Sequence, residues 1–161
     1  PMRFALLGAV AAGLAVGVAL ADRFIYLVYD PRYHDAGLFL TVLLAGSWFA
    51  ILASMAEAMM MGLGKPSGVA FGNGAKFAVV AVALPFVLPR YGLNAAMATF
   101  VAAEAARYLA LTWRKRAAGL GFIRQDIILT FAFFALIFLL REASFLLGIT
   151  GGVGDWIREG H

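Results

Sequence analysis

The amino-acid sequence predicts an all-α, polytopic membrane protein, and three observations support this prediction. Of the 161 residues, 63% are hydrophobic and only 14% are charged, a balance far from that of soluble domains. The apolar residues form continuous runs of about 20 residues, the length of a membrane-spanning helix, rather than the one-sided stripes of surface helices. Runs of about ten residues with alternating polarity, which a membrane β-barrel requires, are not visible.

Five membrane spans are predicted, because short polar connectors separate five apolar runs. The connectors lie at residues 30–35, 64–67, 89–91 and 114–126. The predicted spans cover approximately residues 4–29, 36–63, 67–88, 91–116 and 126–148. We expect them to form a single transmembrane domain over residues 1–161.

Pairs of glycines four residues apart occur in the first and third predicted spans. They are Gly13 with Gly17, and Gly68 with Gly72. This small-xxx-small spacing lets helix backbones approach closely in lipid. We therefore interpret these glycines as packing residues rather than as a ligand site.

The first apolar run has two interpretations. Arg3, the apolar stretch after it and the small residues before Asp22 also fit a secretory signal peptide over residues 1–21. However, the uncharged run from Phe4 to Ala21 exceeds the hydrophobic region of about 7 to 15 residues in such peptides. A membrane span is therefore favoured, and the signal peptide is the alternative.

Basic residues outside the spans predict the orientation, because cytoplasmic loops carry an excess of Lys and Arg. One side carries Arg3, Lys65, Arg114, Lys115, Arg116 and Arg124, and the other carries Arg23, Arg32, Arg90 and Arg158. We expect the first side to face the cytoplasm. These cations flank apolar runs and form no stripe with exposed aromatics, so we expect no nucleic-acid partner.

The most polar stretch, residues 29–37, is the one candidate for a catalytic or metal site. It contains two aspartates, an arginine, a histidine and two tyrosines. One histidine between two aspartates lacks the helical His pair of a zinc site, and the chain has no cysteine to supply a thiol. We interpret the stretch as an outer turn, and predict no catalytic residue, metal ligand, cofactor or enzyme activity.

Four charged residues are the clear cases at membrane depth within the predicted spans, where each costs about 2.5 to 3.5 kcal/mol and needs a partner or a hydrated cavity. They are Glu57, Lys76, Glu104 and Arg107. At 1.5 Å of rise per residue, all four fall roughly 12 to 18 Å from the cytoplasmic end of their helix. We expect Glu57 to meet Lys76 across a helical hairpin, and Glu104 to meet Arg107 at i,i+3 spacing.

Two interpretations of this charged layer remain open. In the first, the two pairs are structural and neutralise each other. In the second, the layer faces a hydrated translocation cavity, where Lys76 and Arg107 attract an anionic headgroup while Glu57 and Glu104 tune the charge or bind a proton. The four residues are thus the candidate substrate-binding set.

Three motifs resemble the C-terminal half of bacterial polysaccharide exporters, the lipid-linked oligosaccharide (O-antigen type) flippases. The similar segments are YDPRYHDAG, an apolar helix that ends in MMGLGKPS, and LPRYGLNAAMATFVAAEAARY. The matching positions are Tyr29, Asp30, Tyr33 and Ala36 in an outer turn, Gly64, Lys65 and Pro66 in a cytoplasmic turn, and Tyr91, Gly92, Ala95 and Ala96 in a second outer turn. These proteins belong to the multidrug/oligosaccharidyl-lipid/polysaccharide exporter superfamily.

The resemblance implies a bundle of two six-helix lobes in the bacterial inner membrane. It also implies that the protein flips undecaprenyl-pyrophosphate-linked oligosaccharide for polysaccharide and lipopolysaccharide O-antigen biosynthesis. Lys76 and Arg107 are the positions that would meet the pyrophosphate or acidic sugars. Five spans cannot form both lobes, so we expect a C-terminal fragment whose partners are the lipid bilayer, the lipid-linked glycan and a missing N-terminal lobe.

Three other functions are compatible with the sequence. A multidrug/cation antiporter of the same superfamily would use Glu57 or Glu104 as its coupling carboxylate. A membrane enzyme of envelope glycan assembly would place its active site in an outer loop, for which residues 29–37 are the candidate. A structural membrane subunit would tolerate alanine at all four charged positions.

Overall fold

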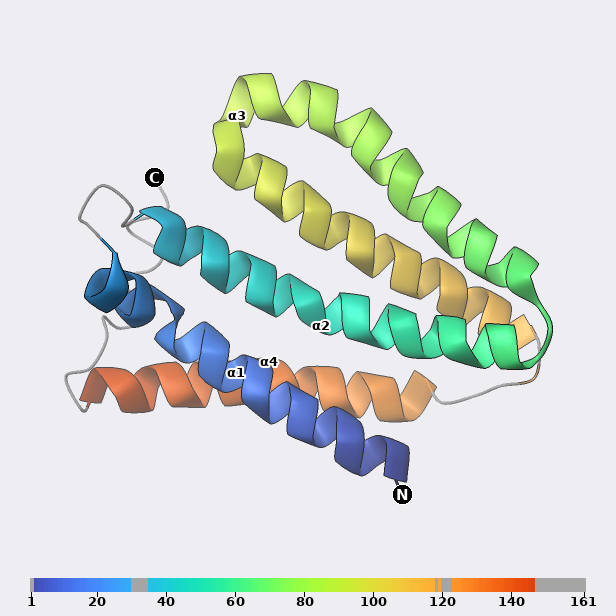
Figure 1. Ribbon diagram of the computed structural model, residues 1–161, viewed down its shortest axis with the longest axis horizontal. Helices are drawn as coiled ribbons and strands as arrows, with labels where there is room; N and C mark the ends of the chain where they lie inside the picture. The colour runs from blue at the N-terminus through green and yellow to red at the C-terminus, as the bar shows by residue number, and fades with distance from the viewer. Residues whose placement is uncertain (1, 30–34, 118, 120–122, 147–161) are drawn as a thin grey trace. The chain divides into compact units, whose positions relative to one another are not determined.

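Four helices make up almost all of the described part of the chain (Figure 1). The structure is a computed structural model that describes residues 2–29, 35–117, 119 and 123–146. The helices are α1 (Met2–Val28), α2 (Asp35–Gly62), α3 (Pro66–Ala117) and α4 (Ile123–Leu146). No strand occurs in these residues. The prediction of an all-α fold is confirmed for them.

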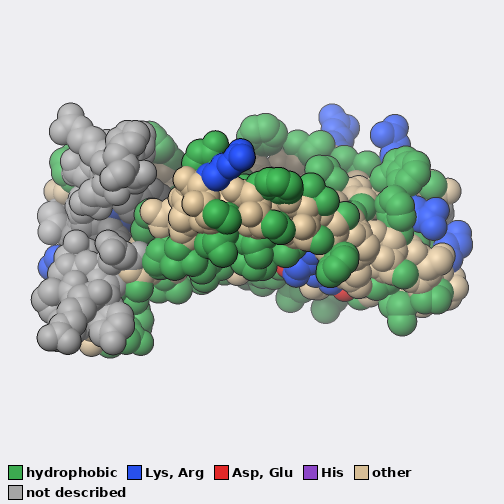
Figure 2. Space-filling model, turned by 90° about the horizontal axis from the view of Figure 1, so that it is seen from above, with side chains coloured by type: hydrophobic (Ala, Val, Ile, Leu, Met, Phe, Trp, Pro, Cys, Tyr) green, Lys and Arg blue, Asp and Glu red, His purple; other side chains and the backbone are tan. Residues whose placement is uncertain are grey.

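Each of the four helices is long and apolar enough to cross a membrane. Large apolar side chains remain exposed on all of them, for example Leu27 on α1, Leu43 on α2, Phe77 on α3 and Phe131 on α4. Figure 2 shows hydrophobic side chains over much of the face that it presents. Exposed large apolar side chains on every helix suit the surface to contact with lipid or with other apolar helices.

The described residues form four continuous helices rather than five, because α3 contains two of the predicted spans, joined across a kink. It is 52 residues long, and Gly92 inside it has the non-helical angles φ 72° and ψ −165°. Figure 1 shows that α3 turns back on itself, so it has a first limb (residues 66–91) and a second limb (residues 93–117). Each limb exceeds the length of about 20 residues that a span requires.

The reversal in α3 lies just after the predicted connector, at Gly92, which is one of the positions of the second outer turn in the exporter resemblance. The connector was expected at residues 89–91, but these are helical, and so is Pro85. The backbone angles of Gly92 fall in a region that is essentially restricted to glycine, because any Cβ would clash there. The chain therefore turns at Gly92, and the two prolines are accommodated within the first limb. The other three predicted spans agree with α1, α2 and α4 to within three residues at each end.

The chain divides into two compact units. Unit 1 comprises residues 1–45 and 125–161, and unit 2 comprises residues 46–124. The first part of α2 thus belongs to unit 1 and the rest to unit 2. Each unit is described by itself, and the organisation of residues 1–161 as a single domain stays a prediction.

In unit 1, α1 packs against the start of α2 and is joined to α4 by an ion pair. A Cβ on Gly17 would lie 3.4 Å from Cδ1 of Leu44, which is ordinary van der Waals contact. A Cβ on Gly13 would meet nothing within 4 Å, so only one glycine of the predicted pair contacts a neighbouring helix. Nη2 of Arg3 lies 2.5 Å from Oδ1 of Asp126 in the first turn of α4.

In unit 2, small residues bring α2 and the two limbs of α3 close together. A Cβ on Gly46 of α2 would lie 2.6 Å from Cγ2 of Val101, and a Cβ on Gly72 would lie 2.6 Å from Cγ of Leu111. Ala53 and Ala56 of α2 form a buried cluster with Leu111 of the second limb. The second limb of α3 therefore packs against both α2 and the first limb.

Candidate functional site

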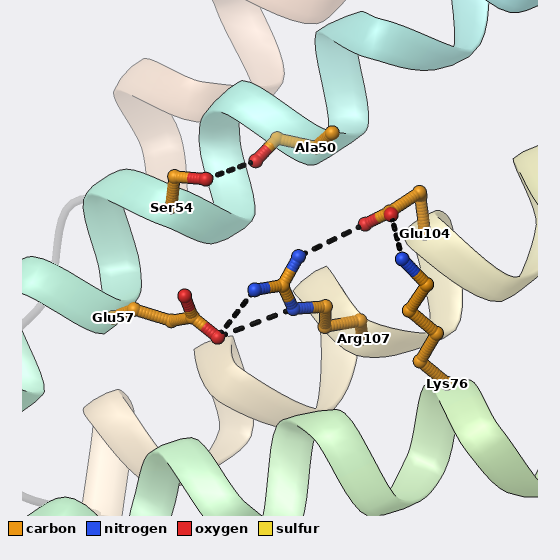
Figure 3. A network of polar contacts seen from close by, with 6 residues as sticks. All are labelled: Ala50, Ser54, Glu57, Lys76, Glu104 and Arg107. Carbon is orange, nitrogen blue, oxygen red and sulfur yellow. Dashed lines mark hydrogen bonds and ion pairs between the residues drawn. The ribbon is translucent and has the colours of Figure 1, made fainter.

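The four charged residues predicted as a substrate-binding set meet in unit 2 and form one network (Figure 3). Glu57 lies on α2, Lys76 on the first limb of α3, and Glu104 and Arg107 on the second limb. Contacts join them in the order Glu57, Arg107, Glu104, Lys76. We call these four residues the charged network.

Arg107 is the central residue of the charged network. Its Nη2 and Nε both donate to Oε1 of Glu57, at 2.6 and 3.2 Å. Its Nη1 donates to Oε2 of Glu104 at 3.3 Å. The second oxygen of Glu104, Oε1, accepts a hydrogen bond from Nζ of Lys76. Glu104 therefore bridges both cations, and Arg107 bridges both carboxylates.

Helical spacing places these side chains opposite one another. On α2, Ala53 and Glu57 are four residues apart, so the face that packs against Leu111 also carries Glu57. On the second limb, Arg107 and Leu111 share a face for the same reason. The alanines keep the helices close, and the long side chains of Glu57 and Arg107 then meet across the contact.

A small residue also positions Lys76 on the first limb. Gly72 precedes Lys76 by four residues and contacts Leu111 of the second limb. Because Gly72 lacks a side chain, the two limbs approach closely enough for the ammonium of Lys76 to reach Glu104. The charged network thus depends on small residues one helical turn from its members.

The pairing differs in part from the predicted one. Glu104 and Arg107 form the expected i,i+3 pair. The predicted pair of Glu57 and Lys76 is wrong, because Glu57 binds Arg107 and Lys76 binds Glu104. A guanidinium has five N–H donors in a planar fork and can hold two carboxylates at once, whereas an ammonium is a compact point charge. Arg107 therefore takes Glu57 in addition to its helical neighbour, and Lys76 takes the remaining oxygen of Glu104.

The charged network carries no net formal charge, and its members differ in exposure. The side chains of Arg107, Glu104 and Glu57 are 15%, 17% and 20% exposed, whereas that of Lys76 is 37% exposed. An anion that approaches unit 2 would thus meet Lys76 more readily than Arg107. If a carboxylate were protonated or displaced, the two cations could bind anionic oxygens in its place.

The other candidate site predicted from the sequence is the polar stretch at residues 29–37. Residues 30–34, which hold most of the polar stretch at residues 29–37, lie outside the described residues. Among the residues that the structure describes, no three His, Cys, Asp or Glu side chains come together as a possible metal site. The catalytic and cofactor predictions therefore stay predictions.

Two contacts were not foreseen from the sequence. The ion pair of Arg3 with Asp126 joins residues 123 positions apart. The sequence indicated only that both residues lie at the same end of their predicted spans. The second is a cluster on α3, in which Phe71 contacts both Trp113 and Arg114. Its signal was the predicted hairpin, which brings the start of one limb beside the end of the other.

No protein-family model, curated protein or solved structure matches the chain.

Proposed function

We propose that this chain is part of a membrane transporter of the exporter type, which flips undecaprenyl-pyrophosphate-linked oligosaccharide across the bacterial inner membrane. The observation that carries the proposal is the charged network. In this proposal the four helices cross the membrane, with each limb of α3 as a separate span. The N-terminal lobe implied by the exporter resemblance completes the bundle.

The position of the charged network supports a membrane role. Lys76 lies ten residues after Pro66, and Arg107 lies ten residues before Ala117, so both are roughly 15 Å from the ends of α3. That distance is half of a hydrocarbon core of about 30 Å. Charges at this depth are rare and mark substrate or ion pathways. Mutual pairing offsets the cost of inserting them when no substrate is bound.

The arrangement fits an anionic cargo. A pyrophosphate group offers several oxygens to which a guanidinium binds in a bidentate manner and an ammonium as a point charge. In the proposed mechanism, the headgroup meets the more exposed Lys76 first and then replaces Glu104 between Lys76 and Arg107. The carboxylates hold the cations when the site is empty, and they limit the affinity so that the cargo can leave.

Complementation of a glycan-export mutant tests the proposal. Expressed with its N-terminal lobe, the wild-type chain is expected to restore surface polysaccharide. The neutral pair of changes Lys76→Gln and Glu104→Gln removes one cation without leaving a lone charge, and is expected to abolish export. Arg90→Gln, an exposed cation near the bend of α3, is the matched control and is expected to export normally. Normal export by the neutral double variant, at equal protein levels, would show that the charged network is structural.

The antiporter of the same superfamily is the alternative that this experiment can favour. It requires Glu57 or Glu104 as a coupling carboxylate that exchanges a proton for a cationic substrate. Both carboxylates already accept hydrogen bonds from cations, which disfavours a cationic substrate at the same place. Efflux of small cations that depends on the proton gradient and is lost in Glu104→Gln would support the antiporter instead.

A further inference from the structure

Phe71, Trp113 and Arg114 form a cluster at the ends of the two limbs of α3. The ring centroids of Phe71 and Trp113 are 5.7 Å apart, with 48° between the ring planes. Cζ of Arg114 lies 5.3 Å from the centroid of Phe71, within the range of a cation–π interaction. We call these three residues the aromatic-cation cluster.

The aromatic-cation cluster lies far from the charged network along both limbs. Phe71 is five residues after the start of α3 and Trp113 is four residues before its end, so both are roughly 6 to 8 Å from the helix ends. If α3 crosses a membrane, this depth corresponds to the interface, where Trp and Tyr rings concentrate, and Trp113 fits this position. Phe71 is 43% exposed and Trp113 is 63% exposed, so both rings present a face to their surroundings.

The same end of unit 2 has a large excess of positive charge. Residues 46–124 contain only two carboxylates, Glu57 and Glu104, and both belong to the charged network. The unit's cations outside the network are Lys65, Arg90, Arg114, Lys115, Arg116 and Arg124. Of these, Lys65, Arg114 and Arg116 lie at or next to the ends of α3 that carry the cluster.

Arg114 keeps its capacity to bind an anion. Its contact with the ring of Phe71 positions the guanidinium, and a ring face leaves most of its five N–H donors available. A phosphodiester accepts two parallel hydrogen bonds from a guanidinium. An apolar surface, two interfacial rings and a fixed guanidinium together match a lipid molecule, whose headgroup phosphate and acyl chains lie side by side.

We propose that the aromatic-cation cluster is a binding site for the headgroup of an anionic phospholipid in the leaflet on the Lys65 side. Arg114 binds the phosphate, neighbouring cations such as Arg116 add long-range attraction, and the rings of Phe71 and Trp113 pack against the upper acyl chain. This inference rests on the part of the proposed function that places α3 across a membrane. It does not depend on which cargo is transported.

Fluorescence quenching in vesicles tests the site directly. The full chain is reconstituted in phosphatidylcholine vesicles that contain a small fraction of either brominated phosphatidylglycerol or brominated phosphatidylcholine. Bromine quenches tryptophan at short range, so the wild-type chain should be quenched more by the anionic lipid. Trp113→Phe should remove this excess, which would assign it to Trp113 rather than to Trp48 or Trp156.

The Arg114→Gln variant tests the role of the guanidinium. One cation near an anionic surface contributes about 1 kcal/mol, so the variant should lower the preference for the anionic lipid about fivefold. Arg114→Lys should keep part of the preference. The matched control is Arg90→Gln, which removes an exposed cation from the other end of the hairpin and should leave the preference unchanged.

The outcomes separate this inference from the proposed function. Equal, strong quenching by both lipids would show that the chain is embedded in the bilayer but has no headgroup site, which would overturn the inference alone. Absence of quenching by either lipid would overturn the membrane arrangement itself. A loss of preference in Arg90→Gln equal to that in Arg114→Gln would show diffuse attraction rather than a site. Loss of the excess quenching on addition of millimolar inorganic phosphate would identify free phosphate as the ligand instead of lipid.

Discussion

Arg107 binds a single oxygen of Glu57 through two of its nitrogens, at 2.6 and 3.2 Å, and so fastens the second limb of α3 to α2. Its third nitrogen is bound to Glu104, which in turn binds Lys76. This relationship makes Arg107 the residue on which the other three depend, and it determines which substitutions should be coupled.

A double-mutant cycle should show coupling between Glu57 and Arg107. We expect Glu57→Gln and Arg107→Gln to be less destabilising together than the sum of the single changes, by about 0.5 to 2 kcal/mol, because each single change leaves a charged partner behind. The measurement is reversible unfolding in mixed micelles.

The control for this cycle combines Glu57→Gln with Lys76→Gln, two residues that do not bind each other. Because they are joined only through Arg107 and Glu104, their coupling should be weaker than that of Glu57 with Arg107. Stronger coupling between Glu57 and Lys76 than between Glu57 and Arg107 would contradict the observed pairing.

Gly46 should tolerate no added side chain while Val101 is present. A Cβ at position 46 would lie 2.6 Å from Cγ2 of Val101, so we expect Gly46→Ala to destabilise unit 2 by about 1 to 3 kcal/mol through overpacking. Val101→Ala in the same chain should recover part of that loss. Thermal unfolding followed by circular dichroism measures both.

Gly74→Ala is the matched control for Gly46→Ala. Nothing lies within 4 Å of a Cβ at position 74, and alanine favours a helix by about 0.8 to 1.0 kcal/mol over glycine. The variant should therefore be as stable as the wild type or more so. A destabilised Gly74→Ala would mean that this face is packed against something that the chain's own residues do not supply.

Gly92→Ala should strain the bend of α3. The angles φ 72° and ψ −165° are essentially available only to glycine, and forcing a residue with a Cβ into this region costs about 1 to 3 kcal/mol. We expect a lower unfolding temperature and faster proteolysis at the bend. Gly62→Ala, where an added Cβ meets nothing within 4 Å, should show neither effect.

The ion pair of Arg3 with Asp126 should stabilise the first turn of α4. The Asp126 side chain is 1% exposed, so Asp126→Asn leaves the cation of Arg3 with a weaker partner and should cost about 1 to 3 kcal/mol. We expect faster amide hydrogen exchange at the start of α1 and α4. Arg124→Gln, an exposed neighbour, should leave exchange unchanged, and equal exchange in Asp126→Asn would show that the pair adds nothing.

The helices were predictable because composition and run length suffice to identify them. The exact residue of the reversal in α3 was not, because Pro85 and Pro89 signal a break more strongly than Gly92 does, yet proline can remain helical when neighbouring groups satisfy the carbonyl it leaves open. The exporter resemblance places Gly92 in a turn, and the backbone angles of Gly92 identify it as the residue at which the chain reverses.

The members of the charged network were predictable from the cost of charges within apolar runs, but their pairing was only half predictable. Glu104 and Arg107 lie on one helix, so their spacing fixes the contact. The partner of Glu57 depends on which faces of α2 and α3 pack together, and this is set by Ala53, Ala56 and Leu111. The hydropathy pattern does not show whether Glu57 pairs with Lys76 or with Arg107, because both cations lie at a similar distance from the ends of their helices.

The hairpin form of α3 has a consequence for biogenesis. Arg107 emerges from the ribosome three residues after Glu104, and Lys76 precedes Glu104 by only 28 residues in the same helix. These three charges can therefore neutralise one another within a single nascent hairpin, and Glu57 has already been synthesised by then. Every charge of the network thus has a partner as soon as the hairpin is complete, so in the proposed membrane arrangement insertion need not wait for α4 to be translated.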